Sequence, residues 1–147
     1  VNLSGFSALE NQGKDIYLSN CASCHGTVAG RPGKTEANNG LYIDYKDKGA
    51  AAFNGGNPRF KVPTLRNVML TAPYMHDGSL ATIDDVLDHY SKNIKNTNGL
   101  DQTLKIGNQP LKMNFSEDEK TALKAFLSTM TDQKVIADVK FSDPFIR

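Results

Sequence analysis

The chain has 147 residues, of which 39% are hydrophobic, and its 17 Lys and Arg against 16 Asp and Glu leave a net charge of +1. This length predicts a single domain over residues 1–147. The near-neutral charge argues against nucleic acid or an anionic membrane as a partner, and no apolar run is long enough to form a transmembrane segment.

The first predicted element is a helix over residues 7–20. Leu9, Gly13, Ile16 and Tyr17 recur there at helical spacing. This helix leads directly into the most informative motif of the chain.

Both cysteines of the chain lie in the motif Cys21-Ala22-Ser23-Cys24-His25, which has the spacing C-x-x-C-H. Two thiols three positions apart lie on one helical turn, where each can form a thioether with a porphyrin vinyl group, and the following His can bind the iron. A thioredoxin-like dithiol would need a βαβ context, and a zinc site would need a second pair of ligands. The motif therefore predicts one covalently attached haem c, with His25 on the iron.

Haem c is attached after export in bacteria, which predicts the location of the protein. We expect a periplasmic or extracellular protein whose signal or upstream segment is absent from this chain. No charged region followed by an apolar stretch is found at its start.

A long loop follows the motif, because residues 26–60 are rich in Gly, Asn and Lys and contain the breaker Gly55-Gly56-Asn57-Pro58. A loop of this length is unusual in a compact domain unless it is functional or wraps a bound group. A haem would account for it.

Two further helices are predicted from their caps. One starts at Thr82, which can cap the amide of Asp84 or Asp85. The other starts at Ser116, with Glu119 completing a capping box. The apolar stripe of the helix from Thr82 consists of Ile83, Val86, Leu87 and Tyr90. The stripe of the helix from Ser116 consists of Leu123, Phe126, Leu127 and Met130.

A first helix that runs into C-x-x-C-H and a last amphipathic helix resemble the two poles of the class I cytochrome c fold, and strand signals are weak. This resemblance implies an all-α, class I cytochrome c-like fold of three or more helices, with long loops around one covalent haem. In such a fold the first and last helices cross near the haem. Gly13 would let the two backbones approach, and Tyr17 would pack near Leu123 and Phe126.

Two neighbouring segments carry a family resemblance: residues 60–68 (FKVPTLRNV) and residues 70–79 (LTAPYMHDGS). They resemble the C-terminal, electron-transferring domain of the bacterial diheme cytochrome c peroxidases and of the related diheme enzymes that mature methylamine dehydrogenase. Residues 123–132 are also similar to that family. The resemblance runs over about residues 13–131, and the tail 132–147, with Asp143-Pro144-Phe145, is consistent with it.

The chain departs from the family in having one C-x-x-C-H motif and no Trp. Family peroxidases carry two such motifs on a chain about twice as long, with a Trp between the haems. The resemblance thus implies a monohaem relative, a module of a larger fusion, or half of a diheme enzyme. In each case it implies electron transfer here and peroxide chemistry elsewhere.

The predicted sixth iron ligand is Met113, and Tyr90 is its rival. Met113 lies in a loop just before a capped helix, from which a thioether can reach the iron, although it could also be an apolar staple. Tyr90 falls where the resemblance places an axial Met or Tyr, although it could also be a core aromatic. Met69 and Met130 are expected in the core, and Met75 is not expected to be a required ligand. His89 is expected to be solvated.

Other residues of the resembling segments have secondary expectations. Pro63 and Arg66 are expected to contact the haem, Arg66 by pairing with a propionate unless it makes an ordinary ion pair. The resemblance implies a calcium site through backbone oxygens of Thr71 and Pro73, whose side-chain ligand belongs to a domain missing here. His76 is expected to be a structural or docking residue.

The leading hypothesis is a monohaem c-type cytochrome that carries single electrons between periplasmic redox partners, or to a fused or partner enzyme. The alternative is a haem peroxidase, or half of a diheme one, that reduces hydrogen peroxide. It would need a distal acid–base group, for which His76 or Glu36 is the candidate. A third hypothesis is a sensor that binds a diatomic gas at an open iron position.

Overall fold

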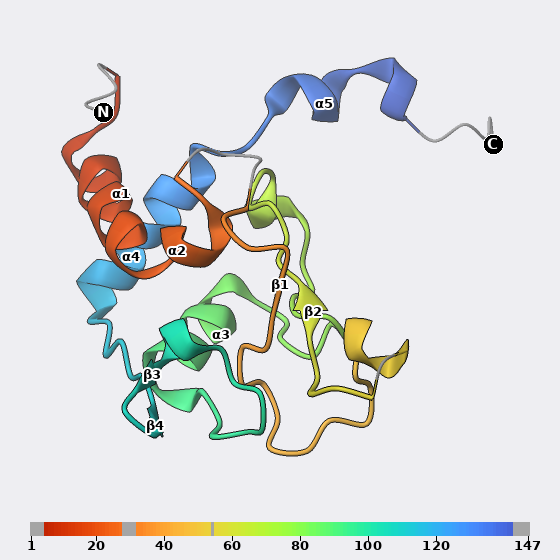
Figure 1. The fold of residues 1–147 in the computed structure, drawn as a ribbon. Helices are drawn as coiled ribbons and strands as arrows, with labels where there is room; N and C mark the ends of the chain where they lie inside the picture. Colours follow the sequence, from red (N-terminus) through yellow and green to blue (C-terminus); the bar gives the residue numbers. More distant parts are fainter. Residues whose placement is uncertain (1–4, 28–31, 54, 143–147) are drawn as a thin grey trace.

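The structure is a computed structural model that describes residues 5–27, 32–53 and 55–142. Helices and long loops dominate it, as predicted (Figure 1). The α-helices of the described part are α1 (Ala8–Asn20), α2 (Ala22–His25), α3 (Ile83–Asp88), α4 (Glu117–Ser128) and α5 (Gln133–Ala137).

Short elements interrupt the loops between these helices. The pairs β1 (Glu36–Ala37) with β2 (Phe60–Lys61), and β3 (Lys105–Ile106) with β4 (Gln109–Pro110), are antiparallel. A π-helix, η3 (His89–Asn93), directly extends α3. The 3₁₀ turns are η1 (Ala50–Phe53), η2 (Val68–Leu70), η4 (Gln102–Leu104) and η5 (Val139–Phe141).

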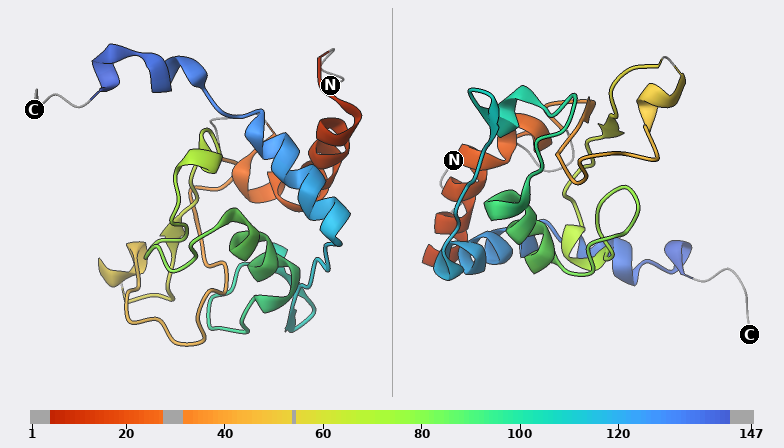
Figure 2. Two further views of the ribbon diagram at one scale, coloured as in Figure 1. Left: turned by 180° about the vertical axis from the view of Figure 1, so that it is seen from behind. Right: turned by 90° about the horizontal axis from the view of Figure 1, so that it is seen from below.

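Helices α1 and α4 cross in close contact, as Figures 1 and 2 show. A Cβ atom on Gly13 would lie 1.9 Å from the carbonyl oxygen of Ala122, so only glycine fits at the crossing. The ring of Tyr17 lies 5.2 Å from that of Phe126, and both belong to one core cluster with Leu123. Both expectations for this crossing are confirmed.

Capping boxes are found at the N-termini of α1, α3 and α4. The predicted boxes are present, with the side chain of Thr82 accepting from the Asp85 amide and that of Ser116 accepting from the Glu119 amide. Ser7 and Glu10 form a third box at the start of α1. Each box satisfies two amides that would otherwise have no partner at the helix end, so short sequence patterns fix where these helices begin.

The core of the described residues has two apolar clusters. One lies around α1 and α4. The other contains Ile94 and Leu100 from the loop after η3, and Leu104 from η4. Tyr90 and Met113 pack against both clusters. The two candidate sixth ligands therefore lie where the halves of the core meet.

The end of the described chain leaves the body of the domain. In all three views α5 and η5 extend away from the crossing of α1 and α4 (Figures 1 and 2). Asp143-Pro144-Phe145, noted in the sequence, lies outside the described residues. Within the described part, no helix has the length and apolar character needed to cross a membrane.

Candidate haem site

The cysteine motif forms the short helix α2, which follows α1 with one residue between them. Cys21 occupies the junction, where its carbonyl oxygen accepts hydrogen bonds from the amides of Cys24 and His25 at 3.2 and 2.9 Å. Both thiols are free and partly exposed. They therefore lie on one helical turn, as covalent attachment to two vinyl groups requires.

The imidazole of His25 is oriented by the backbone of a distant segment. Its Nδ1 lies 3.0 Å from the carbonyl oxygen of Pro63. A carbonyl only accepts, so Nδ1 carries the proton and Nε2 keeps a lone pair for a metal. Burial lowers the pKa of His25, and the hydrogen bond with Pro63 opposes this effect. The neutral imidazole that binds iron is thus the form this site favours.

The segment that follows the motif is fastened beside Cys24. The amides of Gly33 and Lys34 donate to the Cys24 carbonyl oxygen at 2.8 and 3.0 Å. The Lys34 ammonium in turn binds Asp101, and the hydroxyl of Thr103 lies 3.6 Å from the Cys24 sulfur. These contacts hold the loop that carries η4 against the attachment motif.

These residues fit a covalently attached haem c. Two free thiols on one turn would form the thioethers to the porphyrin, and an imidazole whose other nitrogen is fixed by a carbonyl would bind the iron. Burial raises the pKa of the Cys21 thiol to about 12, with a smaller contribution from the charge of Cys24. An apolar environment of this kind suits a porphyrin.

Tyr90 approaches the motif from the π-helix. Burial raises the pKa of its hydroxyl to about 12, and a side-chain hydrogen bond with Asn39 opposes this shift. Negative charge on Cys21 or Cys24 would raise the pKa further. Tyr90 and Cys21 both pack against the core cluster around α1 and α4. π-helices are rare and often occur at functional sites, where the extra residue redirects side chains.

Met113 lies beside Tyr90 in the loop before α4, as predicted from the sequence. Its amide lies 3.4 Å from the Tyr90 carbonyl oxygen, and its side chain is partly buried between the two core clusters. The structure thus brings both candidate ligands to one junction. Met130 packs in the first cluster, as expected.

Comparison with known proteins gives a decisive match. The family model described as cytochrome c matches residues 11–131. The chain belongs to the cytochrome c family. Membership implies covalently bound haem c, and it confirms the predicted class I cytochrome c-like fold.

Relatives of this cytochrome include cytochrome c peroxidases and MauG proteins. Cytochrome c551 peroxidase of Nitrosomonas europaea is 34% identical over 131 residues, covering 83% of this chain and 34% of that protein. MauG, a methylamine utilization protein of Methylorubrum extorquens, is 42% identical over 71 residues, covering 48% of this chain and 18% of its own length. The predicted resemblance to the C-terminal haem domain of this group is confirmed.

A solved structure is similar over nearly the whole chain. It is a MauG-like protein associated with microbial copper homeostasis, 33% identical in sequence, with a TM-score of 0.74. The superposition covers 95% of this cytochrome and 51% of that chain. This cytochrome thus spans about a third of the peroxidase and about half of the solved relative.

One prediction about the site was wrong. His89 was expected to be solvated, but it is 3% exposed, and its Nε2 lies 3.0 Å from the carbonyl oxygen of Asn39. Its ring also meets that of Tyr90 edge to face, with centroids 5.0 Å apart. At this point the chain changes from an α-helix to a π-helix, with His89 buried and Tyr90 partly buried.

The sequence did not single out Asn39. Its side-chain nitrogen lies 3.2 Å from the sulfur of Met75, and its carbonyl oxygen accepts from His89. The only signal in the sequence is a polar Asn-Asn-Gly stretch, which is typical of any turn. Its contacts are visible only in the folded chain.

The secondary candidates lie mostly on the surface. Arg66 is exposed and makes no ion pair with another described residue, which leaves its guanidinium available for a propionate. Thr71 and Pro73 are exposed as well, and the described residues contain no cluster of three or more His, Cys, Asp or Glu that could hold a metal ion. His76 stacks on Phe60 at 3.7 Å.

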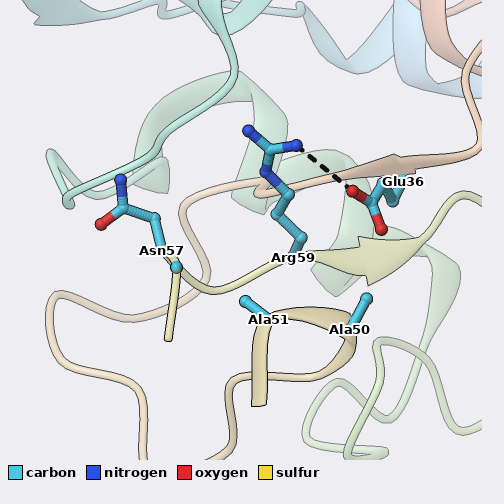
Figure 3. A pocket seen from close by; sticks show the side chains of 6 residues that line it. Glu36, Ala50, Ala51, Asn57 and Arg59 are labelled. Carbon is cyan, nitrogen blue, oxygen red and sulfur yellow. Dashed lines mark hydrogen bonds and ion pairs between the residues drawn. The ribbon is translucent and has the colours of Figure 1, made fainter. Parts of the chain in front are cut away.

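A separate hollow of about 380 Å³ lies between η1 and β2 (Figure 3). Its wall includes Ala50, Ala51 and Asn57, and an ion pair of 3.2 Å joins Arg59 to Glu36 across it. None of the predicted haem-binding residues lines this hollow. We therefore assign it no part in haem binding.

Proposed function

We propose that this domain carries single electrons between redox partners in the periplasm or outside the cell, with His25 and Tyr90 as the axial ligands of its haem. The observation that carries the proposal is the place of Tyr90 on the π-helix, where it packs against the same core cluster as Cys21 of the attachment motif. A haem with protein ligands on both faces exchanges electrons through its edge and needs no substrate pocket.

The choice of Tyr90 over Met113 rests on two supports. Tyr90 belongs to the π-helix, a regular element that fixes its direction, and its ring packs edge to face against that of buried His89 with centroids 5.0 Å apart. Met113 has only a backbone bond near the site, from its amide to the Tyr90 carbonyl oxygen. In this proposal Met113 packs against the ring of the ligand residue.

This ligand pair has a chemical consequence. Bound haem c supplies an iron that cycles between the ferric and ferrous states. A phenolate from Tyr90 favours the ferric state and lowers the reduction potential, whereas a thioether would raise it. The carbonyl of Pro63 acts in the same direction, because it makes the His25 imidazole a stronger donor. We therefore expect a low-potential carrier that releases electrons readily.

The partner is proposed as a second redox domain, fused or separate. This chain spans about a third of the Nitrosomonas europaea peroxidase and about half of the solved relative, and several relatives are named peroxidases. This makes peroxide reduction by an associated domain the natural destination of the electron. No nucleic acid or membrane partner is proposed.

A stand-alone peroxidase is the alternative function, favoured by the names of the relatives. It requires a distal acid–base group close to an open iron position. Of the two candidates, Glu36 pairs with Arg59 beside the surface hollow, and His76 stacks on Phe60. Turnover of hydrogen peroxide by the isolated holoprotein well above that of free haem would replace the electron-transfer proposal with this one.

The test of the proposal is the absorption spectrum of the holoprotein, ferric and ferrous, with and without carbon monoxide. It is recorded for wild type, Tyr90→Phe and Met113→Leu. We expect a low-spin wild type that Met113→Leu leaves unchanged and that Tyr90→Phe converts to a high-spin form that binds carbon monoxide when ferrous. A near-infrared thioether band that disappears in Met113→Leu would instead assign the ligand to Met113. A high-spin wild type that binds carbon monoxide would favour the peroxidase or gas-sensor hypotheses.

A further inference from the structure

An ion pair lies beside the sulfur of Cys24, with one hydroxyl group between them. The hydroxyl oxygen of Thr103 lies 3.6 Å from this sulfur and 2.7 Å from a carboxylate oxygen of Asp101. The ammonium group of Lys34 forms an ion pair with the same carboxylate oxygen and donates to the Thr103 hydroxyl oxygen at 3.3 Å. A positive and a negative charge are thus both held next to one of the two haem attachment points.

The proton of the Thr103 hydroxyl is donated to Asp101. A hydroxyl has one proton to donate, and a carboxylate at 2.7 Å attracts it more strongly than a sulfur at 3.6 Å. The backbone amide of Thr103 donates to the same carboxylate oxygen at 2.9 Å. Two groups of Thr103 therefore hold the Asp101 carboxylate in place beside the Cys24 sulfur.

The backbone fixes both members of the ion pair. The Lys34 amide donates to the Cys24 carbonyl oxygen at 3.0 Å, and the Asp101 amide donates to the Asn38 carbonyl oxygen at 3.0 Å. The side chains of Lys34 and Asp101 are only 29% and 15% exposed, so water and salt screen their charges incompletely. Burial alone would raise the pKa of Asp101, but hydrogen bonds from Lys34 and Thr103 hold it below its ordinary value. The carboxylate is therefore charged at neutral pH.

We propose that the Lys34–Asp101 pair sets the reduction potential of the haem from the Cys24 side, with Thr103 as the residue that positions the pair. This inference rests on the proposed electron-transfer function, and it holds for either candidate sixth ligand. A thioether joins the Cys24 sulfur directly to the porphyrin, so charges beside that sulfur lie close to the redox centre. An unpaired negative charge there favours the ferric state, and an unpaired positive charge favours the ferrous state, whereas the intact pair nearly cancels.

The experiment measures the reduction potential of the holoprotein at pH 7 by titration followed in the absorption spectrum. Asp101→Asn leaves the Lys34 ammonium unpaired, so we expect the equilibrium constant for reduction to rise about fivefold, which is about 40 mV for one electron. Lys34→Gln leaves the carboxylate unpaired and should lower the constant by a similar factor. The double variant has neither charge and should return to within about twofold of wild type. In a Thr103→Val background, where the carboxylate is held less firmly, Asp101→Asn should have a smaller effect.

Asp84→Asn and Lys124→Gln are the matched controls, because they break an ion pair of 2.7 Å between α3 and α4. Within the described residues, no hydrogen bond connects either of these side chains to the attachment motif. Each control should change the equilibrium constant for reduction by less than about twofold. The sign of the shift separates an electrostatic effect from a loosened fold. Asp101→Asn and Lys34→Gln break the same contact, so a loosened fold would shift both potentials in one direction.

Two results would overturn the inference while the electron-transfer proposal stands: shifts of the same sign in Asp101→Asn and Lys34→Gln, or shifts no larger than those of the controls. An Asp101→Asn shift that is unchanged in the Thr103→Val background would remove the positioning role of Thr103. A wild-type holoprotein that cannot be reduced and reoxidised reversibly would remove the electron-transfer proposal itself, and this inference with it.

Discussion

The hydroxyl of Tyr17 donates a 2.6 Å hydrogen bond to the carbonyl oxygen of Gly26, nine residues further along the chain. Tyr17 also packs its ring against Phe126 at the crossing of α1 and α4. Gly26 directly follows His25 and ends α2. One side chain thus connects the main helix crossing to the end of the haem attachment motif, so the stability of the crossing and the placement of His25 are linked.

We predict that Tyr17→Phe destabilises the protein by about 1–3 kcal/mol, because the ring packing remains while a buried carbonyl loses its partner. Urea unfolding of the holoprotein measures this change. Tyr42→Phe is the control, since the Tyr42 hydroxyl donates to Asp77 at the exposed surface, and it should cost clearly less. Equal losses in the two variants would contradict the proposed link.

Local patterns made much of the fold predictable. The C-x-x-C-H turn and the capping boxes at Thr82 and Ser116 each depend on residues within four positions of one another, so the sequence alone is sufficient to place them. The approach of α1 to α4 at Gly13 was predictable for another reason: a glycine on an otherwise apolar helical stripe indicates close packing.

The polar surroundings of the candidate ligand were not predictable in this way. Asn39 contacts Met75 and His89, which are 36 and 50 positions away, and no local pattern encodes such contacts. The burial of His89 was missed because an α-helical period was assumed up to Tyr90. The chain instead changes to a π-helix at His89, and the extra residue per turn moves that side chain into the interior.

The second prediction concerns Gly13. Gly13→Ala should destabilise the protein by about 1–3 kcal/mol or more, because the added Cβ would overlap the Ala122 carbonyl oxygen and force the helices apart. Helix propensity alone predicts the opposite sign, a gain of up to about 1 kcal/mol. Thermal unfolding distinguishes the two effects. Gln12→Ala, at an exposed position of the same helix, is the control and should change stability by less than about 0.5 kcal/mol.

The third prediction concerns pH. Burial alone would raise the pKa of Asp101, but hydrogen bonds from Lys34 and Thr103, together with the charge of Lys34, leave the pKa below its ordinary value. The unfolded chain therefore binds a proton at a higher pH than the folded chain does. The stabilisation is fully present above the unfolded pKa of about 3.9 and is lost as the pH falls through the lower pKa of the folded state.

Asp101→Asn removes this contribution while keeping the shape of the side chain. We expect the variant to be less stable than wild type at pH 6, because the Lys34 ammonium loses its carboxylate partner. The difference should shrink as the pH falls below about 4, because the unfolded chain then binds a proton that the folded carboxylate binds only at its lower pKa. Urea midpoints of both proteins between pH 6 and pH 2 measure this convergence, with Asp44→Asn, at an exposed loop position, as the control. A difference that stays constant over this range would show that the ion pair with Lys34 does not stabilise the loop beside Cys24.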